Sequence, residues 1–310
     1  MPSARTFVRN CASHPCRKCH TECALVLLAA AQTFAATCHQ MERGMPCHIR
    51  AKELGLKCTF VTRDGVETSN RISVRFGSFF DKSHLSMNQV LRLAYFWAEH
   101  PTSTFGAIKR EMNINTDHTV VDFYNFMRDL CQGWADRIQT NELLGGVGRV
   151  VEIDETKYFR AKYNRGRMLN RNHDWIFGIL ERNTNKVRLF PVAKRDANTL
   201  LPIISANVAP GTLIISDGWA AYGGIRNLQQ QFEHRWVNHR LFFVDPQDPQ
   251  VHTQGIEATW RAVKNGLRHL HGTNPEPLQS YLYQYMFRRS NNNEKIFQQI
   301  LEEIRIQYPV

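Results

Sequence analysis

The sequence predicts an α/β protein, and three segments carry this prediction. Residues 212–216 form an apolar run that indicates a buried strand, and Asp217 follows at its carboxyl end. In residues 148–159, apolar and acidic residues alternate with the period of two that is typical of a strand, and Asp154 lies in this segment. Residues 251–268 repeat apolar residues at helical spacing. Strands and a helix in this order favour a sheet that is flanked by helices.

The helix predicted at residues 251–268 has two distinct faces. Glu257 and Arg261 are four residues apart and Lys264 follows three residues later, so these side chains share one face. The other face consists of apolar residues at helical spacing, namely Ile256, Trp260, Val263 and Leu267. We expect the apolar face to pack against the sheet, while the polar face presents a carboxylate with basic residues behind it.

Three acids stand out by their positions. Strand alternation places Asp154 on the face opposite Ile153, away from the apolar side. The separations along the chain are 217 − 154 = 63 and 257 − 217 = 40 residues, which leaves room for other elements between the acids. Glu152 shares a strand face with Asp154, so spacing alone does not choose between these two. Because most acids are solvated surface charges or helix caps, none of them indicates a site by itself.

Five runs occur in order between residues 152 and 289: EIDETKYFRAKYNRGR (152–167), WIFGILER (175–182), ISDGWAAY (215–222), HTQGIEATWRAVKNGLR (252–268) and YLYQYMFRR (281–289). They resemble the DDE transposases of the Merlin superfamily and their bacterial insertion-sequence relatives, and the resemblance covers roughly residues 72–292. The resemblance implies a ribonuclease H-like catalytic core, which is a mixed sheet flanked by helices. It also implies that Asp154, Asp217 and Glu257 are the catalytic, metal-holding acids.

The chemistry that the resemblance implies explains why acids are needed. Cutting a phosphodiester and joining the freed 3′ oxygen to other DNA requires an activated nucleophile and a stabilised leaving oxygen in line on one phosphorus. Two Mg²⁺ or Mn²⁺ ions about 3.5–4 Å apart perform both tasks, and such cations prefer carboxylate oxygens and water. The expected function is DNA transposition, with metal-dependent cleavage at the transposon ends followed by strand transfer into target DNA.

Two alternative functions stay open at the level of the sequence. A domesticated, transposase-derived DNA-binding protein would keep the fold without transposition, and an incomplete cysteine pattern near the start of the chain favours it. A metal-dependent nuclease on the same fold would cut DNA without joining it. Acids at all three expected positions argue against the domesticated protein, which would have lost its catalytic activity. They do not exclude the nuclease, because cutting and joining use the same metal-binding acids.

The chain is basic, with a formal net charge of +11, which favours a polyanionic partner. Charge alone does not distinguish DNA from RNA or an anionic membrane surface. Basic residues interleaved with aromatic ones follow the first acid, a pattern typical of a loop that contacts phosphates and stacks on bases. The expected partners are the terminal inverted repeats, target DNA and further copies of the chain in a homo-oligomer. The predicted DNA-binding residues are Lys157, Arg160, Lys162, Arg165, Arg167, Arg261 and Lys264.

The segment 71–142 is predicted to be a helical DNA-binding region. Residues 85–99 carry a broad apolar stripe, and Ser86 is a suitable N-cap. Residues 104–112 and 118–138 predict two further helices across a short turn, with Asp117 placed to cap the second. Such a pair is typical of a helix-turn-helix that lays one helix in the major groove, and equally of a plain helical bundle.

Seven of the eight cysteines precede residue 60. A Cys-x-x-Cys-His knuckle and later Cys-His pairs supply enough ligands for a structural zinc ion. The transposase family often carries an amino-terminal zinc ribbon with two separated cysteine pairs, but no paired cysteine follows Cys58. We therefore expect either a degenerate zinc ribbon or reduced thiols, and a disulfide framework is disfavoured for an intracellular DNA enzyme. The candidate zinc ligands are Cys16, Cys19, Cys38, Cys47 and Cys58.

The glycine-rich segment 143–148 is the predicted boundary between domains. Basic residues followed by the apolar run 24–36 form a pattern that also occurs in signal and transit segments, so a targeting segment within residues 1–40 stays open as an alternative. The run is shorter than the roughly 20 residues that a spanning helix needs, so no membrane association is expected. The expected location is the nucleus of a eukaryote, or the cytoplasm or nucleoid of a bacterium. The expected domains are a Cys/His-rich segment at 1–70, the helical region at 71–142, the catalytic domain at 148–292 and a C-terminal helix at 293–310.

Overall fold

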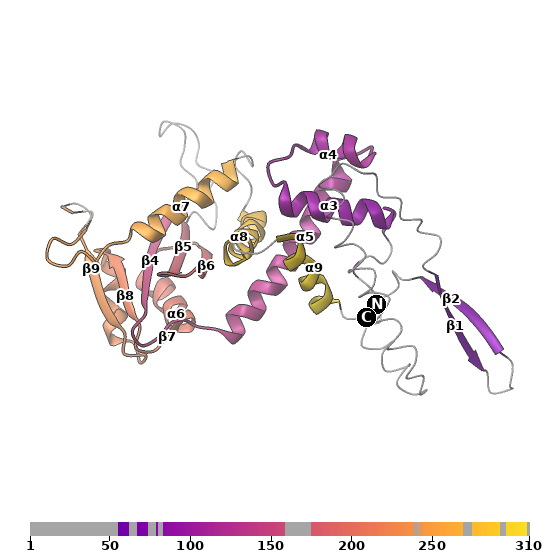
Figure 1. Cartoon of the computed structure of the whole chain (residues 1–310). Helices are drawn as coiled ribbons and strands as arrows, with labels where there is room; N and C mark the ends of the chain where they lie inside the picture. Colours follow the sequence, from indigo (N-terminus) through magenta and orange to yellow (C-terminus); the bar gives the residue numbers. More distant parts are fainter. Residues whose placement is uncertain are drawn as a thin grey trace. The chain divides into compact units, whose positions relative to one another are not determined.

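The structure of the chain is a computed structural model (Figure 1). It describes residues 55–61, 67–73, 79, 83–158, 175–238, 241–242, 244–268, 275–291 and 296–308, with the backbone alone at 55–61, 67–73 and 275–276. The chain divides into two compact units, one comprising Met1–Val120 with Leu301–Val310 and the other comprising Val121–Ile300.

A mixed five-stranded sheet lies at the centre of the second unit, in the order β6-β5-β4-β8-β9 (Figure 1). β5 runs antiparallel to β4 and β6, whereas β8 runs parallel to β4, and β9 parallel to β8. A strand, a hairpin, a crossover helix and a returning strand confirm the predicted α/β class and fit a ribonuclease H-like sheet. The bounds are β4 Val150–Lys157, β5 Trp175–Glu181, β6 Val187–Val192, β8 Leu213–Asp217 and β9 Glu233–Val237.

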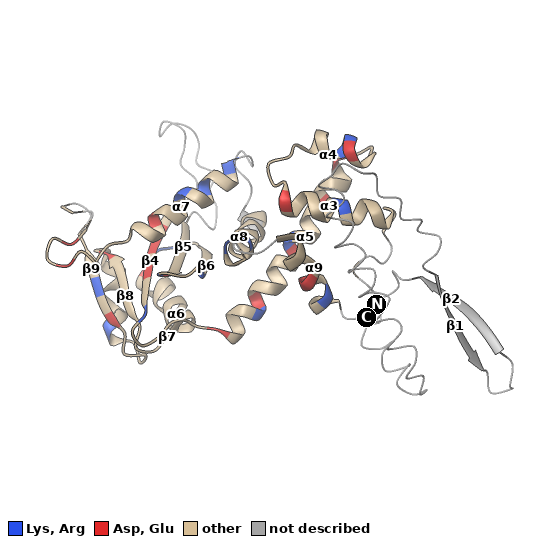
Figure 2. Ribbon diagram, viewed as in Figure 1, with Lys and Arg blue, Asp and Glu red and all other residues tan. Residues whose placement is uncertain are grey.

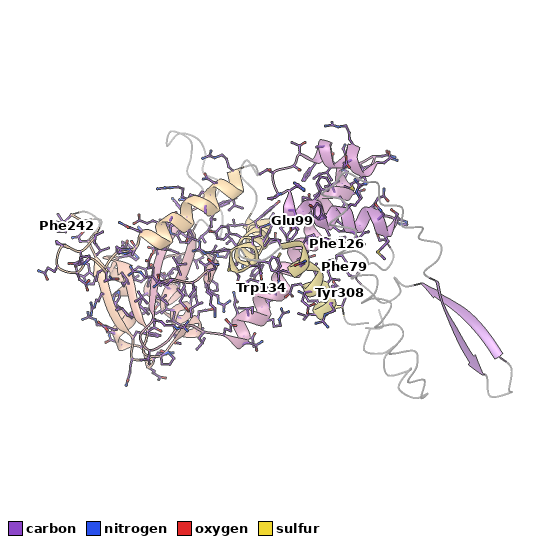
Figure 3. All side chains as sticks on the ribbon, viewed as in Figure 1. Phe79, Glu99, Phe126, Trp134, Phe242 and Tyr308 are labelled. Carbon is purple, nitrogen blue, oxygen red and sulfur yellow. The ribbon has the colours of Figure 1, made fainter. Side chains whose placement is uncertain are left out.

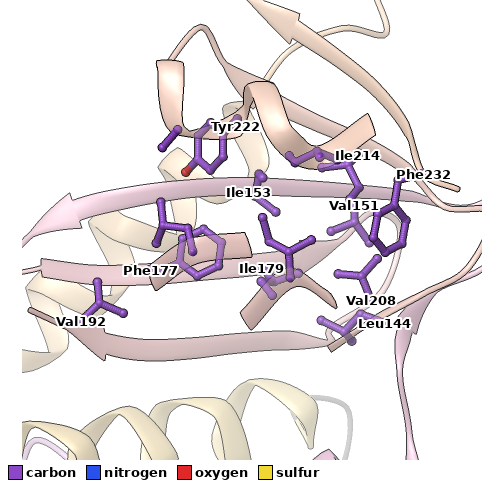
Figure 4. Packing of buried hydrophobic residues seen from close by; sticks show 14 residues of the cluster. Leu144, Val151, Ile153, Phe177, Ile179, Val192, Val208, Ile214, Tyr222 and Phe232 are labelled. Atoms are coloured by element: carbon purple, nitrogen blue, oxygen red, sulfur yellow. The ribbon is translucent and has the colours of Figure 1, made fainter. Parts of the chain in front are cut away.

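One face of this sheet carries the main hydrophobic core (Figure 4). Helix α6 (Ala197–Asn207) and the 3₁₀ helix η2 (Ala220–Asn227) contribute residues to it. Asp196 begins α6 as its N-cap, because its Oδ1 accepts a hydrogen bond of 2.9 Å from the Thr199 backbone. Pro202 lies inside this helix. The core residues labelled in Figure 4 are Leu144, Val151, Ile153, Phe177, Ile179, Val192, Val208, Ile214, Tyr222 and Phe232.

The glycine-rich segment predicted as a boundary is partly a strand. β3 (Leu144–Gly145) pairs in parallel with β7 (Val208–Ala209). Gly145 has a φ of +83°, and a Cβ there would lie 2.4 Å from the Thr212 hydroxyl, so only glycine fits. The segment is thus tied to the strands of the second unit.

The opposite face of the sheet is covered by helix α7 (Gln254–Leu267), which contacts β4 and β5 (Figure 1). Helix α8 (Pro275–Ser290) contacts α7 and β6. Its Phe287 ring meets Trp134 edge to face, with centroids 5.5 Å apart. As the sequence predicted, the buried stripe of α7 contains Ile256, Trp260, Val263 and Leu267, together with Thr259.

Two of the predicted helices lie within the first unit. Helix α3 (Met87–Glu99) begins with a capping box between Ser86 and Gln89, which confirms the predicted N-cap. Helix α4 (Phe105–Met112) follows, and it ends where Asn113 adopts a left-handed conformation with a φ of 52°. These two helices contact each other.

The long helix α5 (Asp117–Asn141) belongs to both compact units, since the division falls after Val120. The prediction that Asp117 caps this helix is wrong. Instead the Thr116 hydroxyl accepts from the Thr119 backbone at 3.4 Å, and Asp117 forms an ion pair of 2.7 Å with Lys109.

Two elements lie near the ends of the chain. β1 (Gly55–Val61) and β2 (Glu67–Ser73) form an antiparallel pair in which Cys58 lies opposite Asn70. Helix α9 (Ile296–Gln307) is followed by Tyr308. The rings of Tyr308 and Phe79 meet edge to face, with their centroids 5.4 Å apart (Figure 3). The other candidate zinc ligands, Cys16, Cys19, Cys38 and Cys47, lie outside the described residues. Within the described part of the chain, no helix is both long and apolar enough to cross a membrane.

Candidate active site

Asp154 and Asp217 lie level with each other on adjacent parallel strands. Where β4 pairs with β8, Val150 lies opposite Leu213, an offset of 213 − 150 = 63 residues. The two aspartates have the same separation, 217 − 154 = 63 residues, so this register places them side by side just beyond the paired part. Residues at one level of neighbouring strands point to the same face. The register therefore brings two carboxylates to one edge of the sheet.

The electrostatics of Asp154 reflect this arrangement. Burial raises the pKa of Asp154 to about 7, and the negative charges of Glu155 and Asp217 contribute to the rise. The Trp260 indole N–H, which donates to Asp154 Oδ2 at 2.8 Å, opposes it. A half-buried carboxylate beside two other acids favours a proton or a cation.

Three hydrogen bonds link alternate residues of β4 to every fourth residue of α7. A strand advances about 6.6 Å in two residues and a helix about 6 Å in four, so the two elements stay in register. The bonds run from Ile256 N to Glu152 Oε2 (2.8 Å), from Trp260 Nε1 to Asp154 Oδ2 (2.8 Å) and from Lys264 Nζ to Thr156 Oγ1 (2.5 Å). Helix α7 therefore lies along the acidic face of β4.

Two glycines allow α7 to approach the sheet closely. Gly178 lies opposite Asp154 in the β4–β5 ladder, and a Cβ there would lie 2.5 Å from Trp260 Cη2. A Cβ at Gly255 would lie 2.9 Å from Glu152 Oε2. Both distances are shorter than real Cβ contacts, so any larger residue would displace the helix.

The structure distinguishes the role of Glu152 from that of Asp154, whereas their spacing in the sequence does not. Glu152 is buried, and its Oε1 accepts from Arg182 Nε at 2.6 Å. The same guanidinium donates to the backbone oxygens of Gln250 (2.7 Å) and His252 (2.5 Å). Glu152 is thus neutralised, and together with Arg182 it fixes the chain that enters α7.

Glu257 lies in the first turn of α7 and is exposed. Its Oε1 accepts from the Thr253 hydroxyl at 3.2 Å. Within the described residues, no three His, Cys, Asp or Glu side chains form a group that could hold a metal ion. The structure thus brings Asp154 and Asp217 together and does not group Glu257 with them.

Glu155 lies on the opposite face of β4 from Asp154. Tyr222 donates its hydroxyl to Glu155 Oε2, and Arg195 donates to Oε1 at 3.4 Å. Burial raises the pKa of Glu155, with the charge of Asp217 adding to the rise. The sequence did not reveal the partners Tyr222 and Arg195, nor Trp260 and Arg182, because each contact joins distant segments.

Three of the seven predicted DNA-binding residues lie in the described part of the chain. Arg261 and Lys264 are exposed on α7, and Figure 2 shows one acidic residue near the beginning of this helix and basic ones towards its end. The Lys157 ammonium lies 5.7 Å from the centre of the Trp175 ring. The remaining predicted residues, Arg160, Lys162, Arg165 and Arg167, lie outside the described part of the chain.

The donor chemistry of the aspartate pair fits a divalent cation. Mg²⁺ and Mn²⁺ prefer carboxylate oxygens, and a cation beside Asp154 and Asp217 would offset their mutual repulsion. Asp154 accepts from the Trp260 indole and Asp217 from the Trp219 backbone, whereas Glu152 and Glu155 are each paired with an arginine. The two aspartates therefore fit such an ion.

Comparisons with known proteins agree with this architecture. Residues 143–290 match the family model of the ISXO2-like transposase domain. Male abnormal protein mab-31 of Caenorhabditis elegans is 27% identical over 246 residues, which are 77% of this chain and 55% of that protein. An uncharacterised transposase-like protein of Haemophilus influenzae is 27% identical over 119 residues, which are 38% of this chain and 93% of that protein. The chain thus spans about half the length of the nematode relative.

A solved structure, the catalytic core domain of BIV integrase, is 17% identical and aligns with 51% of this chain and 97% of that chain at a TM-score of 0.29. The strand order and directions, together with the family match, identify a transposase domain of the DDE class. More narrowly, residues 143–290 are similar to the ISXO2-like transposase domains.

Proposed function

We propose that this protein is an active DDE transposase that cuts DNA at transposon ends and joins the freed 3′ ends to target DNA in a metal-dependent reaction. The observation that carries the proposal is the level pair of Asp154 and Asp217 at the end of two parallel strands. Two carboxylates in this position supply the kind of oxygen ligands that phosphoryl-transfer metals need. The transposase family of residues 143–290 supports the same function.

In this proposal, Asp154 and Asp217 would hold Mg²⁺ or Mn²⁺, with Glu257 as a third carboxylate. A divalent cation bound there would supply Lewis-acid chemistry for the attacking and leaving oxygens of the phosphodiester. Trp260 orients the Asp154 carboxylate through its indole N–H. Arg182 and Glu152 fix the beginning of α7, and with it the position of Glu257.

The partners follow from the same proposal. The DNA substrates would be the terminal inverted repeats and the target DNA, and a homo-oligomer would hold two ends together. Arg261 and Lys264 on α7 are suited to phosphate contacts beside the acids. The corresponding location is the nucleus of a eukaryote, or the nucleoid of a bacterium.

A second candidate function is DNA binding without transposition. It is favoured by the position of Glu257, which is not grouped with the aspartates in the described structure. The cysteine pattern, in which no paired cysteine follows Cys58, favours it as well. A nuclease that cuts without joining would use the same acids.

The test is Mn²⁺-dependent cleavage and joining of a plasmid that carries the DNA flanking the gene. We expect joined products from the wild type, and loss of about a thousandfold or more of this activity in Asp217→Asn, equivalent to about 4 kcal/mol of transition-state stabilisation. DNA binding should stay unchanged in that variant. Glu233→Gln, an exposed acid on β9, is the matched control and should remain active.

Each other result selects a different function. Cleavage without joined products would favour the nuclease, and binding without cleavage would favour the DNA-binding protein. Equal activity of Asp217→Asn and wild type would refute the metal assignment.

A further inference from the structure

A pocket of about 260 Å³ lies beside Asp217 and is not explained by the acidic site. Two of its lining residues are large aromatic side chains that face solvent, Trp219 and Trp236, which are 37% and 52% exposed. Exposed indoles cost free energy when water covers them, so a pair of them at a pocket indicates a binding surface. The other lining residues are Asp217, Gly218, Ala220, Gly223, Arg226 and His234.

Trp219 is held in place on one side. Its indole N–H donates to the Arg195 backbone oxygen at 2.8 Å, and the Arg195 guanidinium lies 3.9 Å from the centre of the ring. The same guanidinium lies 4.5 Å from the centre of the Trp175 ring. Since Arg195 does not line the pocket, this stack supports Trp219 from outside it. A supported ring loses little conformational entropy on binding.

Trp236 enters from the neighbouring strand. It lies opposite Ser216 in the β8–β9 ladder, one residue before the level of Asp217. A Cβ at Gly218 would lie 3.2 Å from Trp236 Cε3, so the glycine lets the ring lie close to the backbone after Asp217. The two indoles therefore reach the pocket from different elements, one from the loop after β8 and one from β9.

Polar groups complete the pocket. Arg226 donates to the His234 backbone oxygen at 2.7 Å, and His234 Nε2 lies 2.9 Å from Ser216 Oγ. Burial lowers the pKa of His234 to about 4, with the Arg226 charge adding to the shift, so its imidazole is neutral at physiological pH. The pocket thus combines two aromatic rings with a guanidinium and a neutral hydrogen-bonding group, and among its described lining residues Asp217 is the one acid.

We propose that this pocket receives one unstacked nucleobase of the DNA strand whose phosphate lies at the aspartate pair. The inference rests on the proposed function, since it places DNA at Asp217. Base stacking on aromatic side chains tolerates any sequence, because every base has a π-face. A volume of about 260 Å³ is below the range of about 300–1,000 Å³ typical of sites for drug-sized ligands and suits a single planar ring system. Removing a base from its stack would also open the backbone beside the reacting phosphate.

The experiment uses a single-stranded thymidine dodecamer that carries one 2-aminopurine at its centre, because this probe requires no knowledge of the terminal repeats. Binding to the full chain should quench the 2-aminopurine fluorescence as the base stacks on the indoles. Trp219→Ala should lose this quenching and bind the probe about tenfold more weakly. Phe126→Ala, a 54% exposed aromatic outside the pocket, is the matched control and should behave as the wild type.

Gly223→Leu tests the pocket without removing a ring. A Cβ at Gly223 meets nothing within 4 Å, so leucine should fill the pocket without disturbing the fold. We expect loss of quenching with unchanged circular dichroism and unchanged thermal midpoint. Quenching that persists in both Gly223→Leu and Trp219→Ala would overturn the proposal, even if the plasmid is still cleaved and joined.

The outcomes separate this inference from the proposed function. Quenching by the wild type that both pocket variants lose supports the pocket, whatever the plasmid assay gives. Plasmid cleavage with no quenching by the wild type would refute the pocket alone. A third result would also overturn the pocket proposal: the 2-aminopurine fluorescence is not quenched on binding, and a tryptophan-containing peptide displaces the thymidine probe. That result would assign the indoles to a protein partner.

Discussion

Two regions of the contact between β4 and α7 differ in how they treat a carboxylate. In the first, Glu152 is paired with Arg182 and accepts a backbone N–H from the first turn of the helix, so its charge is compensated. In the second, Asp154 accepts from an indole and faces another carboxylate, Asp217. The residues lie two positions apart on one strand face. A compensated acid holds the fold together, whereas an uncompensated one is available for chemistry.

The largest effect on stability is expected for Glu152→Gln, which removes the charge compensation in the first region. This change leaves the guanidinium of Arg182, which is only 12% exposed, without its anionic partner. Breaking a buried ion pair in this way costs about 3–5 kcal/mol, so we expect a large fall in the free energy of unfolding. Urea denaturation followed by far-UV circular dichroism measures it.

The matched control is Glu302→Gln, which breaks the exposed pair with Arg305 and should leave the urea midpoint unchanged. A Glu152→Gln variant as stable as the wild type would show that the first region is not held by charge compensation.

At Asp154 we expect the opposite effect, because removing this carboxylate's charge should raise the free energy of unfolding. The pKa of Asp154 is about 7 in the folded chain, against 3.8 for an ordinary solvated aspartate, so between these values the folded protein binds the extra proton. Its free energy of unfolding therefore falls as pH rises from about 4 to 7. Asp154→Asn removes this loss and should be more stable than the wild type by about 2–4 kcal/mol at pH ~8.5.

Urea midpoints at about pH 4.5 and about pH 8.5 in EDTA measure this difference, because these values lie near the two ends of the titration. We expect the advantage of Asp154→Asn to be much larger at the higher pH, and Mn²⁺ to stabilise the wild type but not the variant. An advantage that is the same at both pH values would remove the electrostatic distinction between the two regions.

The contacts in both regions depend on how closely α7 lies on the sheet. Gly178→Ala places a methyl group against the Trp260 ring and should cost about 1–3 kcal/mol while displacing the indole from Asp154. A lower thermal midpoint and a changed near-UV spectrum would report it. Gly266→Ala is the control, because a Cβ there meets nothing within 4 Å and improves helix propensity. Equal midpoints for the two variants would contradict the close approach.

The smallest effect is expected on the outer face of α7. Arg261→Ala should lower the slope of log binding affinity against log salt by about one unit, as for one lost phosphate contact. Lys264→Ala should change it less, because Lys264 Nζ already donates to Thr156. Fluorescence anisotropy of a labelled duplex at several salt concentrations measures both slopes. A larger change for Lys264 would place the DNA across the other side of the helix.

Much of the fold could be predicted because its signals are local. The apolar run before Asp217, the alternation around Asp154 and the stripe of α7 each indicate an element within a few residues. Ser86 and Thr104 cap the helices that follow them, as short-range hydrogen bonding requires. Element types and approximate bounds were therefore readable from the sequence.

The partners of the acids could not be read in the same way. Trp260 was predicted as a packing residue, and the structure adds its hydrogen bond to Asp154, 106 residues away. Glu152 and Asp154 were indistinguishable by spacing, and only the position of Arg182 tells them apart. The offset of 63 residues was visible in the sequence, but its meaning depends on the register between β4 and β8. Which side chains meet is a property of the assembled sheet.

The three-way grip of Arg182 on Glu152, Gln250 and His252 has an evolutionary consequence. It anchors the chain immediately before α7, so the length of the segment between Val237 and Gln250 has no direct influence on where the helix begins. Because the entropic cost of a longer loop grows only slowly with its length, relatives could gain or lose whole insertions there. We expect lineages of this domain to diversify at that segment while the spacing from Arg182 to β4 stays fixed.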